Sequence, residues 1–172
     1  MSNTEPAVEL QQRQQEFSEN KDCSTWGDKI GTKANEVVRI SFQNINGFGY
    51  KYKDRKAERI REYMEEIEVD IMLMAEINVN WRIIGRINTI NSVTRGWFDN
   101  QKVNTSYNQR CRTCKEYQPG GTAIIKNGET ALKAEKSGQD RRGKGRWSWQ
   151  LLRGKNNIRL RVVSVYFPIA KK

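Results

Sequence analysis

The strongest constraint on the fold is a strand, a helix and a second strand that follow one another within about 40 residues. Residues 37–42 (VVRISF) are apolar and β-branched, as in a buried strand. Residues 53–68 place apolar side chains at helical spacing, and residues 69–76 (VDIMLMAE) form a second apolar run that ends in a carboxylate. Two strands joined by a helix are parallel, with a right-handed crossover. The sequence therefore predicts an α/β fold built on a βαβ unit.

Three more strands are expected later in the chain. Gly120 and Gly121 form a turn signal before residues 122–126 (TAIIK). Residues 147–152 and 158–167 are separated by RGKNN, which is typical of a hairpin connection. Apolar and basic side chains alternate along the second of these segments, as in a strand with one buried face.

Residues 81–118 form a long middle segment rich in Asn, Arg, Thr and Gly. Because a stretch of that length without structure is uncommon, we expect a short helix near residues 81–90. Cys111 and Cys114 in this segment have the spacing of a zinc knuckle. A tetrahedral zinc site needs two more ligands, and the third cysteine, Cys23, is distant in the sequence, so a second chain would have to complete it.

The charge is distributed unevenly along the chain. Residues 1–35 have few apolar side chains and are expected to form a flexible leader before a domain that spans residues 36–172. Within that domain, residues 36–76 carry a net charge of −2 and residues 77–172 a net charge of +15, against +11 for the whole chain. So strong a positive charge favours a polyanionic partner such as nucleic acid, although a solvated basic surface would give the same count.

Several absences restrict the function. No apolar run approaches the roughly 20 residues that a membrane span needs, and the N-terminus lacks the apolar core of a secretory signal, so we expect no membrane partner. Three cysteines cannot build a disulfide framework, which favours a reducing, intracellular compartment, the nucleus among them. The chain has no histidine, so neither a Ser-His-Asp triad nor a histidine-ligated zinc site can be completed within it.

Polar side chains stand at the ends of the two predicted parallel strands. Asn44 and Asn46 follow the first strand, and Glu76 follows the second. Because ligands gather at the carboxyl ends of parallel strands, and Mg²⁺ takes carboxylate and amide oxygens, Glu76 and Asn44 are candidate metal ligands. For the asparagines alone, an ordinary Asn-Gly turn is the simpler explanation. A carboxylate directly after an apolar strand is harder to explain in that way, since an unpaired buried charge is costly.

A basic segment precedes the strand expected at residues 147–152. It places four cations directly before two indoles: Arg141, Arg142, Lys144, Arg146, Trp147 and Trp149. We expect the cations either to face solvent or to contact the phosphates of nucleic acid. The two tryptophans lie two residues apart on a strand and so point to the same face, and we expect them in the core rather than stacked on bases.

Five segments follow one another in a characteristic order: SFQNINGF (41–48), the helix (53–68), DIMLMAEIN (70–78), PGGTAII (119–125) and LRVVSVYFP (160–168). In this order they resemble the endonuclease/exonuclease/phosphatase superfamily, whose members have the deoxyribonuclease I-like fold. The phrase QPGGT and the basic GKGRWSWQLL segment are most similar to the endonuclease domain of non-long-terminal-repeat retrotransposons. The resemblance covers residues 36–168 and implies the first part of a four-layered α/β/β/α sandwich.

The resemblance also implies roles for single residues. Asn44 matches an asparagine that helps to organise the active site, Glu76 matches the glutamate that binds the catalytic metal, and Tyr166 matches a tyrosine that contacts the scissile phosphate. The role of Asn46 is less defined. The implied reaction is Mg²⁺-dependent hydrolysis of phosphodiester bonds in DNA, in which the metal polarises the phosphoryl oxygen.

The sequence departs from the family pattern after Pro168. Family members continue with a Gly-Asp-x-Asn segment and later a Ser-Asp-His segment, whereas here no aspartate follows Asp140 and no histidine occurs. Because such groups act as a unit, we expect a truncated domain with little or no turnover by itself. In the family the C-terminal half supplies much of the second sheet, so part of an apolar sheet face would lack its partner here, and a second chain could cover the exposed face.

Two other functions stay open on the sequence alone. The first is a non-catalytic basic module that binds nucleic acid through residues 77–172. The second is a phosphatase that acts on inositol or sphingolipid headgroups, since the superfamily includes such enzymes and the basic charge does not distinguish between the two kinds of phosphate.

Overall fold

The computed structural model describes residues 30–49, 55–85, 89–110 and 115–168. The chain divides into two compact units, Met1–Gly31 and Thr32–Lys172. The first unit lies almost entirely outside the described residues, and with it most of the leader expected at residues 1–35. Every helix and strand of the described residues belongs to the second unit.

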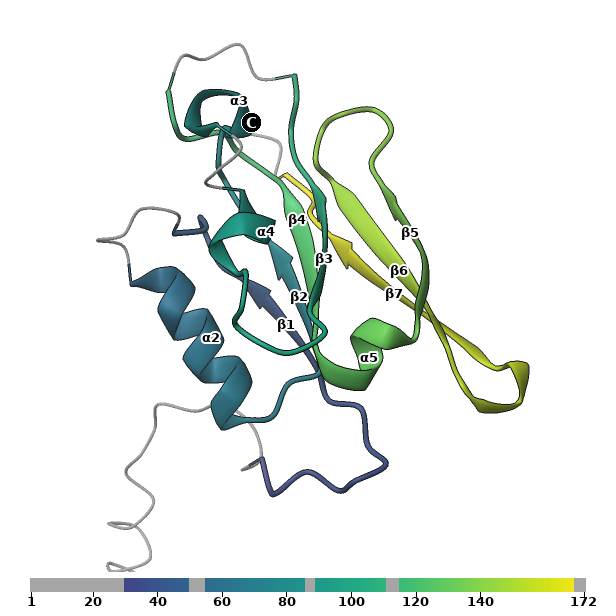
Figure 1. The fold of residues 1–172 in the computed structure, drawn as a ribbon. Coiled ribbons are helices and arrows are strands. Elements are labelled where there is room, and N and C mark those ends of the chain that lie inside the picture. Colours follow the sequence, from purple (N-terminus) through teal and green to yellow (C-terminus); the bar gives the residue numbers. More distant parts are fainter. Residues whose placement is uncertain (1–29, 50–54, 86–88, 111–114, 169–172) are drawn as a thin grey trace, which may run out of the picture. The chain divides into compact units, whose positions relative to one another are not determined.

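The first sheet has four strands in the order β1-β2-β4-β3 (Figure 1). The strands are β1 (Ile40–Asn44), β2 (Ile71–Ala75), β3 (Lys102–Ser106) and β4 (Thr122–Lys126). β1 and β2 are parallel, with Ile40 opposite Ile71, whereas β4 runs antiparallel to both of its neighbours. The predicted parallel pairing and the predicted strand at residues 122–126 are therefore confirmed. The first strand differs from the prediction, since it begins at Ile40 and its residues are exposed or half-buried, because β1 lies at the edge of the sheet.

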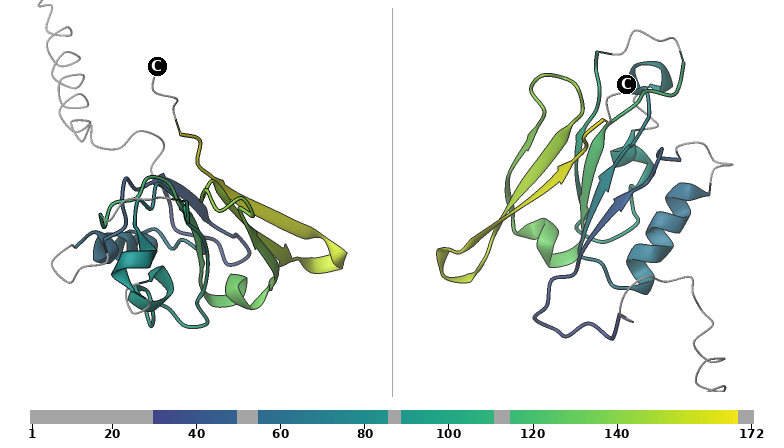
Figure 2. Two further views of the ribbon diagram at one scale, coloured as in Figure 1. Left: turned by 90° about the horizontal axis from the view of Figure 1, so that it is seen from above. Right: turned by 180° about the vertical axis from the view of Figure 1, so that it is seen from behind.

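Helix α2 (Lys56–Glu66) joins β1 to β2 and covers one face of the first sheet (Figures 1 and 2). It lies within the helix predicted at residues 53–68. Its buried side chains are Ala57, Ile60 and Met64, which are three and four residues apart and so share one side of the helix. They join one apolar cluster with side chains from β2 and β4: Met72, Met74, Ala123 and Ile125.

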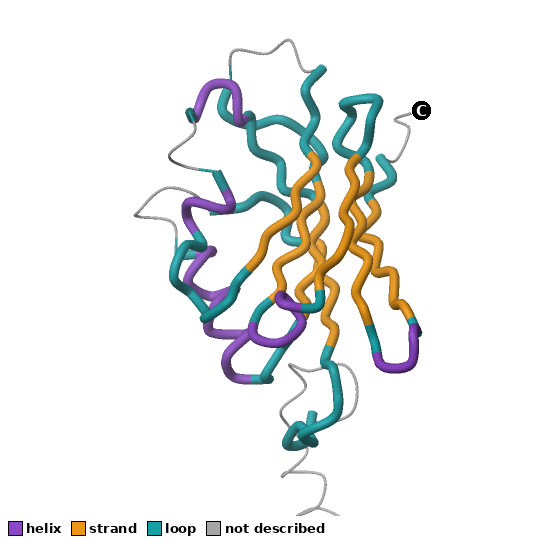
Figure 3. The backbone as a smooth tube through the Cα atoms, turned by 45° about the vertical axis from the view of Figure 1, so that its right-hand side comes forward, coloured by secondary structure: helices purple, strands orange, loops and turns teal. Residues whose placement is uncertain are grey.

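The second sheet has three antiparallel strands in the order β5-β6-β7. They are β5 (Ala134–Gln139), β6 (Trp147–Arg153) and β7 (Arg159–Val165). A short 3₁₀ turn, η2 (Lys155–Asn157), joins β6 to β7, so the predicted hairpin is confirmed. This sheet packs on the face of the first sheet that α2 does not cover (Figure 3).

The two sheets meet through a small apolar cluster and several hydrogen bonds. The buried members of the cluster are Ile71, Leu73, Ile124, Leu152 and Val162. Beside it, the Thr122 hydroxyl donates to Ser148 Oγ at 3.0 Å, and the Ser164 hydroxyl donates to the carbonyl oxygen of Met74 at 2.7 Å. The space between the sheets is therefore partly polar, and each of these buried hydroxyl groups has a partner.

The tryptophans of β6 point away from the first sheet, contrary to the expectation that they lie in the core. Ser148, Gln150 and Leu152 are the buried residues of this strand, and they alternate with Trp147 and Trp149. Because side chains alternate between the two faces of a strand, both indoles lie on the outer face of the second sheet and are partly exposed. The polar residues face inward because they find hydrogen-bond partners on β4.

The middle segment contains two short helices, α3 (Trp81–Ile84) and α4 (Ile90–Val93), before β3. The helix expected near residues 81–90 is confirmed at α3. Sequence reasoning does not predict β3 (KVNTS) or β5 (AEKSGQ), because both are largely polar. They are strands because each pairs along its length with a neighbour, β4 or β6.

The described part of the chain is thus a mixed α/β fold with two sheets and four α-helices, the fourth being α5 (Gly128–Leu132). In this part no helix combines the length and the apolar character that crossing a membrane requires.

Candidate functional site

The ends of β1 and β2 bring two of the predicted site residues to one edge of the first sheet. Asn44, the last residue of β1, is directly opposite Ala75, and Glu76 follows Ala75. The two chains stay in contact past the strands, since the Ile45 N–H donates to the Ala75 carbonyl at 3.1 Å and the Gly47 N–H donates to the Glu76 carbonyl at 2.6 Å. The predicted metal ligands Asn44 and Glu76 therefore stand on neighbouring strand ends.

Glu76 has a backbone conformation that is unusual for its residue type. Its φ angle is +56°, and Asn46 and Asn78 nearby have φ angles of +42° and +53°. Asparagine tolerates the left-handed region through local hydrogen bonds, whereas glutamate does so at a cost of order 1–3 kcal/mol. Such strain is often found at functional sites, and here it occurs at a half-buried glutamate that directly follows a fully buried strand.

Asn78 connects the segments around this edge. Its side chain is 5% exposed, and its Oδ1 accepts a hydrogen bond from the Gly120 N–H at 2.8 Å. Its Nδ2 lies 3.4 Å from Asn46 Oδ1, and its backbone N–H donates to the Gly120 carbonyl at 2.8 Å. The loop after β1, the loop after β2 and the Gly120-Gly121 turn are thereby held together. Sequence reasoning missed Asn78, whose signal was an asparagine between the apolar residues Ile77 and Val79.

Tyr166, the third predicted site residue, follows β7 and reaches the same region. Its backbone N–H donates to the Arg146 carbonyl at 2.7 Å, and its ring packs against Gly120, where an added Cβ would lie 3.3 Å from the Tyr166 ring. Partial burial and the negative charge of Glu76 raise the pKa of the Tyr166 phenol above its usual value. The phenol therefore stays protonated near neutral pH, and it can donate a hydrogen bond to an anionic oxygen.

The predicted nucleic-acid-binding residues lie in the loop between β5 and β6, which is organised around one buried carboxylate. Asp140 accepts hydrogen bonds from the backbone N–H groups of Arg142 at 2.9 Å and of Lys144 and Arg146 at 3.2 Å. Burial raises the pKa of Asp140, but these three hydrogen bonds outweigh it and hold the pKa below its usual value. Sequence reasoning did not single out Asp140, since its partners are backbone groups.

This loop is also fixed to the first sheet at Gly145. The Gly121 N–H donates to the Gly145 carbonyl at 3.0 Å, and the Gln109 N–H donates to the Gly143 carbonyl at 2.8 Å. Gly145 has a φ angle of +66°, and an added Cβ would lie 2.5 Å from the backbone nitrogen of Asn108. Only glycine fits here, so the cations of the loop are presented from a rigid base.

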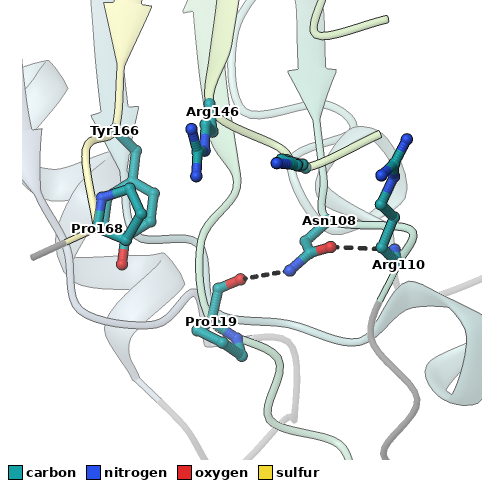
Figure 4. Close-up of a pocket in the computed structure, with 7 residues that line it drawn as sticks. Asn108, Arg110, Pro119, Arg146, Tyr166 and Pro168 are labelled. Carbon is teal, nitrogen blue, oxygen red and sulfur yellow. Dashed lines mark hydrogen bonds between the residues drawn. The ribbon is translucent and has the colours of Figure 1, made fainter. Parts of the chain in front are cut away.

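A pocket of about 280 Å³ opens between this loop, the Pro119 turn and the end of β7 (Figure 4). It is lined by Asn108, Arg110, Pro119, Lys144, Arg146, Tyr166 and Pro168. Asn108 holds the floor by donating to the Pro119 carbonyl at 3.2 Å and accepting from the Arg110 N–H at 3.0 Å. Three cationic side chains and a phenol therefore line one pocket, and no carboxylate is among its lining residues.

The four predicted nucleic-acid-binding residues separate into two pairs. Lys144 and Arg146 line the pocket with Tyr166, whereas Arg141 and Arg142 are exposed on the loop and are not among its lining residues. Asn108 and Arg110, which sequence reasoning missed, complete the lining from the segment that follows β3. Their signal was the high Asn and Arg content of residues 81–118.

The donors available for a metal at the strand edge are few. In the described residues no group of three or more His, Cys, Asp or Glu side chains lies close enough together to hold a metal ion. Mg²⁺ needs only one or two carboxylates beside water and substrate oxygens, so the Glu76 carboxylate suits that ion. The Asn44 amide oxygen accepts a hydrogen bond from the Asn46 N–H at 3.2 Å, as in the turn that the sequence suggested, and keeps one lone pair for a metal. Cys111 and Cys114, considered for zinc, lie outside the described residues.

Comparisons with known proteins give no family for the chain. No protein-family model matches it, and no curated protein matches it significantly.

Proposed function

We propose that this chain is the metal- and phosphate-binding part of an endonuclease-like domain related to Mg²⁺-dependent hydrolases of nucleic acid. The observation that carries the proposal is the grouping of Glu76, held at a positive φ, with Tyr166 and with the basic pocket at one end of the two sheets. Carboxylate, phenol and cations are the groups that a metal-assisted phosphodiesterase needs around its phosphate.

Each group has a distinct task in this proposal. Glu76 and Asn44 would hold Mg²⁺, which supplies Lewis-acid stabilisation of charge on the phosphoryl oxygens. Tyr166 would donate a hydrogen bond from its phenol to a phosphate oxygen, and Lys144 and Arg146 would bind the neighbouring phosphates of the strand. The 172 residues contain no histidine and no aspartate after Asp140, so we expect little turnover from this polypeptide by itself.

The proposal includes the finer fold, the first part of a four-layered α/β/β/α sandwich. A helical layer and two packed sheets are its first three layers, and the outer face of the second sheet would receive the fourth or a second chain. In support of this, that face carries Trp147, Trp149 and the exposed Val163 and Val165. Apolar side chains gathered in this way favour a covering partner.

The second candidate is a non-catalytic basic module that binds nucleic acid. The observation in its favour is the pocket itself, which has three cations and no carboxylate among its lining residues and so suits phosphate binding without a metal. The two candidates share the basic pocket and differ in the role of Glu76.

The test separates phosphate binding from metal dependence. Binding to a short double-stranded DNA is measured across a salt series for the unmodified protein, for the Lys144→Gln/Arg146→Gln double variant and for a Lys133→Gln/Lys155→Gln control. The control removes two exposed lysines that lie outside the pocket. The quantity compared is the slope of the logarithm of the binding constant against the logarithm of the salt concentration. Losing two phosphate contacts should lower the size of this slope by about 2 in the pocket variant and leave it unchanged in the control.

Metal dependence is measured with Glu76→Gln, with Glu65→Gln on the exposed side of α2 as its matched control. If the domain is endonuclease-like, Mg²⁺ raises DNA affinity or permits slow nicking of supercoiled plasmid, and only Glu76→Gln removes this effect. DNA binding that is equal in Mg²⁺ and EDTA for all proteins supports the non-catalytic module instead. Equal salt slopes for the pocket variant and the control would contradict both candidates.

A further inference from the structure

A second group of cations lies at the opposite end of β4 from the candidate functional site. β4 begins at Thr122, beside the Gly120-Gly121 turn of that site, and ends at Lys126. Lys126 is 1% exposed, so its ammonium group lies between the two sheets. The proposed function gives this buried charge no role.

The ammonium of Lys126 has one neutral partner. It donates to Gln150 Oε1 at 2.8 Å. The amide nitrogen of Gln150 donates to the carbonyl oxygens of Lys136 at 2.7 Å and Leu151 at 3.0 Å, which fixes the amide with its oxygen toward Lys126. Among the described residues no carboxylate pairs with Lys126. A buried charge with one neutral acceptor is costly unless an anion joins it.

Other lysines add to this charge. Lys102 on β3 is directly opposite Lys126 in the strand register, and like charges in that position repel each other. Burial and the charge of Lys102 together lower the pKa of Lys126 to about 8. Lys136 on β5 approaches from the second sheet, and neither it nor Lys102 has an ion-pair partner among the described residues.

These three lysines line one pocket. Its volume is about 350 Å³, within the range of small-molecule sites, and Gln101, Asn104 and Gln150 are also among its lining residues. Glu135 is the one carboxylate in the lining, and Arg153 and Arg159 bind its two oxygens at 2.7 and 3.2 Å. The pocket therefore has an excess of positive charge that its own carboxylate does not neutralise.

We infer that this pocket binds a phosphate dianion, either free phosphate or the phosphate group of a small phosphomonoester. The three lysines of the lining carry compact ammonium charges, which suit a tetrahedral oxyanion, and the lining contains no arginine whose planar guanidinium fork would select a carboxylate. Lys102 and Lys136 are exposed and give the anion a path from solvent to the buried Lys126. This inference does not depend on the proposed function, because the two sites share no residue.

Calorimetric titration of the full chain with inorganic phosphate at neutral pH and constant ionic strength tests the inference. Sodium chloride serves as the ionic control, and adenosine monophosphate serves as the phosphomonoester. We expect saturable phosphate binding and a rise in Tm that chloride does not produce. Tighter binding of adenosine monophosphate would identify an ester as the ligand, and equal or weaker binding would identify free phosphate.

Variants assign the binding to this pocket. Lys102→Gln and Lys136→Gln change exposed residues and should each weaken phosphate binding about tenfold, the effect of losing one charged hydrogen bond. Lys126→Met should abolish it. The Lys144→Gln/Arg146→Gln variant of the other pocket should bind phosphate normally. The inference is overturned if phosphate acts no differently from chloride, or if the Lys144→Gln/Arg146→Gln variant loses the binding while Lys102→Gln keeps it.

Discussion

The two sheets differ in how many of their faces are buried. Every residue of β2 and β4 is buried, because helices cover one face of the first sheet and the second sheet covers the other. In β6 buried and partly exposed residues alternate, and in β7 only Val162 and Ser164 are buried. The central strands β2 and β4 are therefore the structural core, whereas the edge strands β1 and β3 are mostly exposed or half-buried. The second sheet is attached through one face and carries the loop that lines the basic pocket.

The largest expected effect is a loss of stability that differs between the two sheets. Met74→Ala removes a fully buried side chain between α2 and the first sheet, and should lower the free energy of unfolding by about 2–5 kcal/mol in urea denaturation. Val163→Ala on the outer face of the second sheet, where the side chain is 46% exposed, should cost less than about 1 kcal/mol. Equal losses for the two variants would contradict the contrast between the sheets.

The next effect concerns Lys126, the one lysine among the fully buried residues of the first sheet. Its pKa is about 8 in the folded protein against 10.5 ordinarily, so between these values the unfolded chain binds more protons than the folded one. Folding stability should therefore rise with pH through this window by up to roughly 3 kcal/mol relative to Lys126→Met. Urea unfolding of both proteins at several pH values in phosphate-free buffer measures this change in the free energy of unfolding. The same pH dependence in the unmodified protein and in Lys126→Met would refute the prediction.

A smaller loss of stability is expected at Asp140. This residue holds the loop between β5 and β6 of the second sheet through hydrogen bonds and not through apolar burial. Asp140→Asn replaces a carboxylate that accepts hydrogen bonds from three backbone N–H groups, and should lower the free energy of unfolding by about 1–3 kcal/mol near neutral pH. Because the pKa of Asp140 is lowered by folding, its contribution is complete above the ordinary aspartate pKa and is lost as the pH falls through the lower, folded value. The variant should therefore approach the unmodified protein in stability at acid pH, and a constant difference would contradict this.

The contrast between the sheets also explains how much of the fold the sequence could predict. Strands that are buried on both faces appear as continuous apolar runs, so residues 71–75 and 122–126 are recognisable from local pattern. β3 and β5 are not, because their polar sequences become strands only through pairing with β4 and β6. The sequence of β6 also could not show which of its faces is buried. Ser148 and Gln150 point inward because they form hydrogen bonds with β4.

The candidate site follows the same division. Asn44 and Glu76 could be predicted from their places at strand ends, and the structure sets them on adjacent strands. Asn78 and Asp140 could not, because what distinguishes each of them is a set of partners that the fold supplies: the Gly120 amide for Asn78 and three loop amides for Asp140. Local sequence therefore shows which side chains could form a site. It does not show which residues hold them in place, because those contacts come from distant parts of the chain.

The smallest expected effect tests whether the outer face of the second sheet is free in solution. The Arg161 guanidinium lies 4.8 Å from the centre of the Trp149 ring on this face. If only solvent covers the pair, Arg161→Gln should cost about 0.5–1 kcal/mol, as exposed cation–π contacts do, and the cost should not depend on protein concentration. A second chain on this face would exclude water from the contact and make the loss larger and concentration-dependent in urea unfolding. Such a result would mean that both faces of the second sheet are buried in solution, as both faces of β2 and β4 are. The outer face would then be exposed only when the chain is by itself.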